Sequence, residues 1–314
     1  MQSIDIIVPC YNEEASIAPF YTEVSKVLAN VSQDYFCRIL FVDDGSSDDT
    51  MTEIHKLVDM AGGDRIKYIS FSRNFGKESA LYAGLSNSNA DYCVVMDADL
   101  QHPPELITEM LAEIASGDCD CVGARRTSRN GEPVIRSFFS RGFYYVINWA
   151  TGMHLVPGMT DFRIMKRKVV NAIISMGESE RFIKGIYSWV GFKTRWIEYK
   201  NVERTYGQSK WSFRGLWNYA KSGFIAFAVT PLRGVVYMGM LAVLAALVYA
   251  VKLWHDLHVH ARHWEDTTTI IILMLFLGGV IITVLGLIGE YIARIYMEVK
   301  HRPIYIERES NLDD

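Results

Sequence analysis

Short apolar runs alternate with helical patterns along residues 1–125. The apolar runs predict buried strands over residues 4–9, 38–42, 66–71, 92–96 and 119–122. Between them, the spacing of apolar positions predicts helices over residues 14–29 and from about residue 77. A further helix opens at His102-Pro103-Pro104-Glu105, since proline is favoured in the first turn. This alternation predicts an α/β domain with a mostly parallel, doubly wound sheet and right-handed crossovers.

Two long apolar segments follow Gly223. No charged residue lies between Arg233 and Lys252, and none lies between Asp266 and Glu290. About 20 apolar residues cross a hydrocarbon layer of about 30 Å, so we expect two transmembrane helices, about residues 232–253 and 268–290. A pair of buried core helices is the alternative. The overall mean hydropathy of +0.08 is high for a wholly soluble protein and favours the membrane interpretation.

Charges beside these segments predict their orientation. Basic residues flank the pair on both sides, whereas the connecting loop carries Arg262 against three carboxylates. By the positive-inside rule, both ends of the chain are cytoplasmic, and we expect a multi-pass membrane protein. The N-terminus lacks the basic and apolar regions of a signal peptide. We therefore expect a cytosolic domain (1–210), an amphipathic juxtamembrane helix (211–230), a two-helix hairpin with a short outer loop (231–297) and a cytosolic tail (298–314).

Charge and cysteine content exclude some classes of protein. A net charge of −4 gives no reason to expect nucleic acid binding. The five cysteines form no C-x-x-C motif, and most fall in predicted strands, where a reduced thiol packs as a small apolar group. We therefore expect neither a disulfide nor a zinc site.

The most informative polar motif is Asp97-Ala98-Asp99, at the end of the predicted strand 92–96. Ligands of open α/β sheets bind beyond the carboxyl ends of the strands. Mg²⁺ favours a few carboxylates combined with substrate phosphates, and Gln101 adds another oxygen on the same turn. The motif therefore indicates a metal held against a diphosphate, although so short a motif also occurs in ordinary acidic turns.

Acidic residues also follow the first two predicted strands, at Glu13 and at Asp43-Asp44. These carboxylates can accept hydrogen bonds from a base or a ribose, and Tyr11 offers a face for a base. Helix capping by the aspartates and a favourable helix dipole at Glu13 are the structural alternatives. The first strand is followed by neither G-x-G-x-x-G nor a Walker A sequence, which argues against dehydrogenase and P-loop folds.

Taken together, the strand-end motifs resemble family-2 glycosyltransferases of the GT-A fold, which are nucleotide-diphospho-sugar transferases. These motifs are Val8-Pro9-x-Tyr11-Asn12-Glu13-Glu14, Asp43-Asp44-Gly45-Ser46 and Asp97-Ala98-Asp99-Leu100-Gln101. Four more motifs extend the resemblance over nearly the whole chain: Arg73-Asn74-Phe75-Gly76-Lys77-Glu78, Gly158-x-x-Asp161-Phe162-Arg163, Arg204-x-x-Gly207-x-Ser209-Lys210 and Gly289-Glu290-Tyr291-Ile292 to Lys300-x-Arg302-Pro303. The set is similar to polyprenyl-phosphate glycosyltransferases, which include dolichyl-phosphate mannose synthases, and looks most like bactoprenol glucosyltransferases.

The resemblance implies a distribution of site residues. The nucleoside would be held by Pro9, Tyr11, Glu13 and Asp44. Mg²⁺ or Mn²⁺ would be surrounded by Asp97, Asp99 and Gln101, and phosphates would meet Arg125 and Arg136. Asp161 would lie near the sugar and the acceptor, and Arg204, Ser209 and Lys210 would clamp a phosphate of the acceptor or the leaving group.

The implied function is inverting transfer of a hexose, with glucose from UDP-glucose favoured, to undecaprenyl phosphate for later glycosylation of cell-surface polymers. Other sugars stay open: N-acetylglucosamine, mannose, galactose or aminoarabinose. Transfer to a lipid hydroxyl with Asp161 as base, and a membrane-anchored nucleotide-sugar sensor, are the rival interpretations. Gln208-Ser209-Lys210-Trp211 lacks the Gln-x-x-Arg-Trp signature, which argues against processive polymerisation. Self-association through the spans or the tail is also open.

Overall fold

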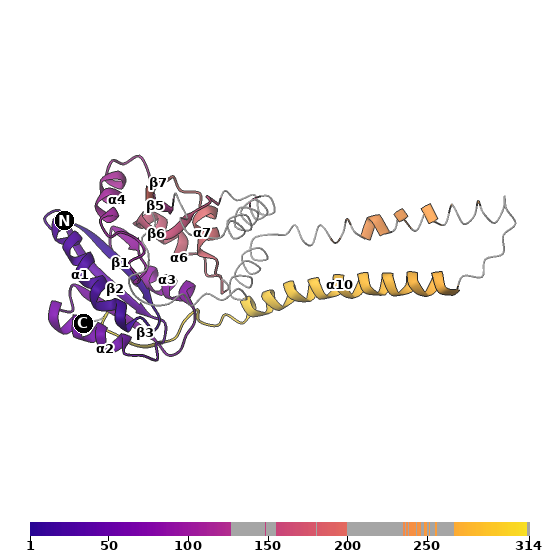
Figure 1. The fold of residues 1–314 in the computed structure, drawn as a ribbon, viewed down its shortest axis with the longest axis horizontal. Helices are drawn as coiled ribbons and strands as arrows, with labels where there is room; N and C mark the ends of the chain where they lie inside the picture. The colour runs from indigo at the N-terminus through magenta and orange to yellow at the C-terminus, as the bar shows by residue number, and fades with distance from the viewer. Residues whose placement is uncertain are drawn as a thin grey trace. The chain divides into compact units, whose positions relative to one another are not determined.

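A computed structural model describes residues 1–126, 148, 155–179, 181–199 and 267–312, with single positions between 235 and 255. The chain divides into two units. One unit comprises Met1–Ala226 and Pro303–Asp314, and the other comprises Phe227–Arg302. Figure 1 shows the first unit as an α/β domain and the second around a long helix.

An eight-stranded sheet organises the first unit, in the order β7-β5-β6-β4-β1-β2-β3-β8. Its strands are β1 (Gln2–Cys10), β2 (Tyr35–Asp43), β3 (Ile66–Phe71), β4 (Tyr92–Val95), β5 (Cys121–Arg126), β6 (Met159–Lys166), β7 (Thr194–Tyr199) and β8 (Glu307–Ser310). The central strands β4, β1, β2 and β3 pair in parallel. Two antiparallel strands border this core, β6 against β4 and β8 against β3. The predicted α/β class with a mostly parallel sheet is confirmed.

Helices cover both faces of the sheet (Figure 1). They are α1 (Glu14–Val31), α2 (Thr50–Ala61), α3 (Lys77–Ser86), α4 (Leu106–Ala115), α6 (Arg167–Ile174) and α7 (Ile183–Trp189). Ile6 and Val8 pack in one apolar cluster with residues of α1, α2 and α4. On the other face α3 lies very close to the sheet, because a Cβ on Gly84 would stand 2.3 Å from Ile7 Cγ2. Alternate residues of β1 thus serve the two layers, as the period of a strand requires.

The strands predicted over residues 1–125 all form. The last one is shifted along the chain, because β5 begins at Cys121 and continues to Arg126 rather than ending at residue 122. Its extra residues gain backbone pairing from two neighbours, β6 and β7. Hydrogen bonding across the sheet therefore carries the strand beyond the apolar run that the sequence pattern detects.

All five cysteines are free thiols. Cys10, Cys93, Cys119 and Cys121 are buried, and Cys37 is half-buried. Burial raises the pKa of every one of these thiols, for Cys37 and Cys93 to about 11. They pack as small apolar groups in the α/β unit.

In the second unit, helix α10 (Thr267–Val299) has 33 residues. Within it, Phe276–Val299 is long and apolar enough to cross a membrane, with a mean hydropathy of 2.0. It is the one such helix among the described residues. The first predicted span, 232–253, lies largely outside the described residues, although single positions there are helical. The pair of spans therefore stays a prediction.

Candidate active site

Two carboxylates from neighbouring strands meet at the carboxyl end of β4. Val95 of β4 pairs with Arg163 of the antiparallel strand β6, and two residues beyond this pair stand Asp97 and Asp161. The Lys77 ammonium lies between them, 2.7 Å from Asp97 Oδ1 and 2.9 Å from Asp161 Oδ2. The site thus joins a loop after β4, the start of β6 and the first residue of α3.

Charge pairing dominates the electrostatics here. Burial opposes a charge on Lys77, but the carboxylates of Asp161 and Asp97 outweigh it and raise the pKa of the ammonium. Burial likewise acts to raise the pKa of Asp161, but Lys77 and then Lys184 outweigh it, and this pKa lies well below its ordinary value. Asp161 is therefore ionised at neutral pH. Its Oδ1 is buried without a hydrogen-bond partner in the described part of the chain, so it keeps the capacity to accept one.

The loop after Asp97 turns sharply. Leu100 adopts a left-handed backbone conformation with φ of 53°, and the Gln101 amide N–H donates to Asp99 Oδ1 at 3.2 Å. Arg126, at the end of β5, donates from Nη2 to Gln101 Oε1 at 3.2 Å. Its Nε donates to the Tyr199 hydroxyl at 3.0 Å. This arginine therefore holds the acidic loop against β5 and β7.

The sequence analysis singled out Arg125 for phosphate binding. Its Nε donates to the Pro157 carbonyl at 3.1 Å, and its Nη1 lies 3.7 Å from Glu198 Oε1. Neighbouring side chains of a strand point to opposite faces, and Arg126 is the one that contacts the acidic loop, while phosphate binding by Arg125 stays a prediction. The sequence analysis did not single out Arg126. The alternation of side chains along β5 could have indicated that Arg125 and Arg126 lie on opposite faces of the sheet.

The residues expected to hold a nucleoside follow β1 and β2. Tyr11 is 37% exposed, and Pro9 is half-buried. Glu13 accepts a hydrogen bond from Ser16 Oγ at 2.8 Å. The backbone N–H of Glu13 donates to Thr50 Oγ1, which ties the end of β1 to α2. Nucleoside binding by these residues stays a prediction.

Asp44 is 3% exposed and forms hydrogen bonds with the loop after β3. Its carboxylate accepts the backbone N–H groups of Phe75 at 2.6 Å and Gly76 at 2.9 Å. Burial raises the pKa of Asp44 to about 6 against the lowering effect of these bonds. Next to it Gly45 has φ of 69°, and a Cβ there would stand 2.4 Å from the Arg73 carbonyl carbon. The loops after β2 and β3 are thus in direct backbone contact.

The donor set fits a divalent cation that binds with a phosphate group. In the described ranges, no three His, Cys, Asp or Glu side chains gather closely enough to hold a metal ion. Asp97, which is paired with Lys77, and Asp99 offer hard carboxylate oxygens on one turn, and Gln101 Oε1, which accepts a hydrogen bond from Arg126, adds an amide oxygen. Mg²⁺ commonly takes one or two carboxylates and completes its shell with water and substrate phosphates. Four predicted residues, Arg136, Arg204, Ser209 and Lys210, lie outside the described residues.

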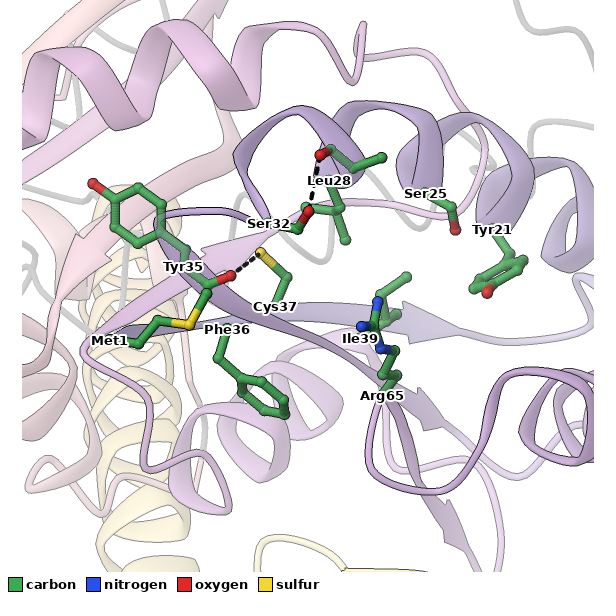
Figure 2. Close-up of a pocket in the computed structure, with 11 residues that line it drawn as sticks. Met1, Tyr21, Ser25, Leu28, Ser32, Tyr35, Phe36, Cys37, Ile39 and Arg65 are labelled. Carbon is green, nitrogen blue, oxygen red and sulfur yellow. Dashed lines mark hydrogen bonds between the residues drawn. The ribbon is translucent and has the colours of Figure 1, made fainter.

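A separate cavity of about 380 Å³ opens at the amino ends of the strands, opposite the acidic loops. Figure 2 shows it between α1 and the start of β2, with Tyr21, Phe36 and Arg65 among its lining residues. Aromatic and aliphatic groups dominate its lining, and it contains no carboxylate. It therefore lacks the chemistry of the candidate active site.

Comparison with known proteins relates both parts of the chain to families. Residues 5–174 match the model of glycosyl transferase family 2, and residues 230–295 match the model described as the GtrB C-terminal hairpin. The putative glycosyltransferase CsbB of Bacillus subtilis (strain 168) is 42% identical over 309 residues, which cover 98% of this chain and 92% of that protein. The SfII prophage-derived bactoprenol glucosyl transferase of Shigella flexneri is 36% identical over 308 residues, with 98% of each chain covered.

Among solved structures, the chain is similar to glucosyl-3-phosphoglycerate synthase from Mycobacterium tuberculosis in complex with Mn²⁺, UDP-glucose and phosphoglyceric acid. The TM-score is 0.46 at 18% identity, with 70% of this chain and 76% of that chain covered. So distant a likeness transfers no residue roles.

Proposed function

The chain belongs to glycosyl transferase family 2, and from this premise we propose that it transfers glucose from UDP-glucose to undecaprenyl phosphate, with inversion at the anomeric carbon. The observation that carries the proposal is the meeting of Asp97 and Asp161 around Lys77 at the carboxyl ends of the strands. The full-length similarity to bactoprenol glucosyl transferases supports the donor sugar and the lipid acceptor.

Family membership confirms the expected enzyme class, a glycosyltransferase with the GT-A type of α/β fold. This favours an enzyme over the membrane-anchored sensor that the sequence analysis also considered. The recognised family, with its relation to bactoprenol glucosyl transferases, is confirmed as well.

Residues of the first two loops would bind the donor's nucleoside. Tyr11 presents an exposed ring to the base, and Glu13 and Asp44 stand at the adjoining strand ends. Asp97, Asp99 and Gln101 would hold Mg²⁺ or Mn²⁺, which supplies positive charge to the departing diphosphate. Arg126 keeps the loop that carries these groups against β5.

A lipid phosphate needs little activation as a nucleophile. The second pKa of a phosphomonoester is about 6, so the acceptor oxygen already carries charge at neutral pH. We therefore assign Asp161 to orienting the sugar or the acceptor rather than to removing a proton. Its buried Oδ1 can accept a hydroxyl hydrogen bond while Oδ2 stays paired with Lys77.

The membrane arrangement follows the charge pattern. We propose that α10 is the second of two spans, that the hairpin of residues 231–297 crosses the inner membrane, and that the catalytic domain faces the cytoplasm. The match to the hairpin family and the apolar stretch Phe276–Val299 support membrane association. The juxtamembrane helix of residues 211–230 lies outside the described residues and stays a prediction.

Transfer from radiolabelled nucleotide sugars to undecaprenyl phosphate in detergent tests the proposal. The full-length protein is assayed with Mg²⁺, with Mn²⁺ and with EDTA, beside Asp99→Ala and a control, Asp59→Ala, at an exposed position of α2. We expect metal-dependent labelling of the lipid from UDP-glucose, lost in Asp99→Ala and kept in the control.

Other outcomes would change the proposal in defined ways. Labelling from another donor would replace the sugar and leave the acceptor in place. Labelling of diacylglycerol instead of the lipid phosphate would mean that the acceptor is a hydroxyl, which requires a general base. Asp161 would then be assigned as that base. A product with retained anomeric configuration would exclude a single direct displacement.

A further inference from the structure

Residues 303–312, the last that the structure describes, form a segment that we name the C-terminal strap. It belongs to the α/β unit, although it follows the apolar helix α10 in sequence. Its strand β8 pairs antiparallel with β3, with Ile69 opposite Ser310 and Phe71 opposite Glu307. The strap thus completes the sheet beside the strand that leads to Lys77.

One end of the strap is fixed by Asn311, which is 7% exposed. Its side chain accepts the Tyr68 backbone N–H at 2.7 Å and donates to the Ile66 carbonyl at 3.1 Å. The ammonium of the buried Lys67 donates to the Asn311 carbonyl at 2.7 Å. An asparagine amide that satisfies two backbone groups of β3 extends the ladder beyond the paired residues of β8.

The other end of the strap contacts the end of β3 and the end of α3. The Tyr305 ring stacks on Phe71 with 4.8 Å between centroids, and its hydroxyl accepts Asn87 Nδ2 at 3.0 Å. Asn87 follows the last residue of α3. The Ser72 N–H donates to the Ile306 carbonyl at 2.9 Å, in the first residue after β3.

These contacts enclose the segment that places Lys77. Residues 72–76 connect β3 to α3, and Lys77 is the first residue of that helix. The strap holds this connection at Ser72, and Asp44 holds it at Phe75 and Gly76. The backbone before Lys77 is thus held at both ends of the connection. After Lys77, the close packing of Gly84 on β1 fixes helix α3 against the sheet.

We propose that the C-terminal strap is a positioning element of the active site, in which Asn311 and Tyr305 keep the β3–α3 connection, and hence Lys77, in register with Asp97 and Asp161. Neither residue touches the reacting groups, so both are positioning residues. A displacement of a catalytic group by about 1 Å can cost up to about 10²-fold in rate. The inference builds on the proposed glycosyl transfer for its kinetic readout alone.

Protection of an open sheet edge is the simpler explanation for β8, since unpaired edge strands invite aggregation. Edge protection needs only the ladder with β3. It does not require an asparagine side chain bonded to β3, nor a tyrosine that joins β3 to the end of α3. The two explanations differ in what happens to residues 72–77 when a strap side chain is removed.

Hydrogen–deuterium exchange and steady-state kinetics on full-length variants separate them. The variants are Asn311→Ala, Tyr305→Ala, the conservative Tyr305→Phe that keeps the ring stack, and Arg308→Ala as a control at an exposed position of β8. We expect faster exchange at residues 72–77 and a kcat about tenfold lower in both alanine variants, with KM for the nucleotide sugar within about twofold. Tyr305→Phe, which keeps the ring stack and loses only the bond to Asn87, should lie between Tyr305→Ala and wild type, and Arg308→Ala should match wild type.

Faster exchange confined to residues 66–71 and the strap, or an unchanged kcat in the folded alanine variants, overturns the positioning function. A kcat loss that only follows the folded fraction overturns it too. The exchange measurement does not depend on the donor or the acceptor, so failure of the proposed transfer reaction and failure of this inference are distinguishable.

Discussion

β6 and β8 are both antiparallel strands that border the parallel core of the sheet, yet they serve the candidate site differently. β6 lies beside β4 and brings Asp161 to within 2.9 Å of Lys77. β8 lies beside β3, and the strap that contains it contacts residues 218 to 245 positions earlier in the chain through Tyr305 and Asn311. β6 thus supplies a charged group of the site, whereas the strap, in our proposal, positions Lys77 from the opposite border of the parallel core.

The largest effect is expected from the β6 side, with Asp161→Asn. The substitution removes the charge that pairs with Lys77 and weakens the orientation of the sugar or acceptor. We expect kcat to fall about 10²–10³-fold, the range typical of losing one electrostatic contact to the transition state. Asp120→Asn, next to β5 and paired with Lys168, is the control and should stay near wild type. Intact turnover in Asp161→Asn would remove any catalytic function from this residue.

Lys77→Met tests whether Asp161 on β6 and the strap beside β3 both affect activity through the Lys77 ammonium. Without the ammonium, Asp97 and Asp161 lose the cation that they share, and we expect kcat to fall about 10²-fold. The matched control is Lys56→Met, an exposed lysine of α2. If Lys77→Met lost less activity than Asn311→Ala, the placement of this lysine could not explain a strap effect.

The pH dependence of stability tests the contact between Asp44 and the β3–α3 connection, in which Asp44 accepts the N–H groups of Phe75 and Gly76. The native pKa of Asp44 is about 6, above the value near 3.9 of an unfolded chain. The stabilisation that this shift supplies is therefore complete below about pH 4 and is lost as the pH rises through about 6. Relative to Asp44→Asn, wild type should lose roughly 1–3 kcal/mol of unfolding free energy between pH 4 and 7.

Urea denaturation followed by tryptophan fluorescence at several pH values measures this difference. Equal pH slopes for wild type and Asp44→Asn would show that another group governs the dependence.

The smallest effect is expected from Tyr305→Phe. This change removes the hydrogen bond with Asn87 and keeps the stack on Phe71, so it should lower the unfolding free energy by about 0.5–1.5 kcal/mol. Thermal unfolding of the full-length variant in detergent measures it, with Tyr21→Phe on α1 as the comparison. A melting temperature that moves equally in both would mean that the Tyr305 hydroxyl adds nothing specific to the strap.

Residues near one another in sequence were the ones that sequence patterns predicted well. The strands of the parallel core carry apolar runs, and the acidic motif at Asp97 follows one of them directly. Asp161 was expected from a family motif, and the structure places it on β6 beside β4, while its function stays a prediction. Local pattern thus indicated the acidic turn after β4, whereas Asp161 came from the resemblance alone.

The strap was beyond such reasoning. Glu307-Arg308-Glu309-Ser310 has no apolar alternation, so nothing local indicates a strand, and the sequence analysis described residues 298–314 only as a tail. Its structure comes from pairing with β3 across most of the chain length. Lys77 was equally hard to assign from sequence, because its two partners lie 20 and 84 positions away.

The state of the five thiols has a practical consequence for spectroscopy. Thiolates, not thiols, react with maleimides, and every native cysteine has its pKa raised by burial. At neutral pH the native chain should therefore give a low labelling background without removal of any cysteine. A single Arg308→Cys substitution, at an exposed position of β8, would then accept one fluorophore or spin label and report on the strap during turnover.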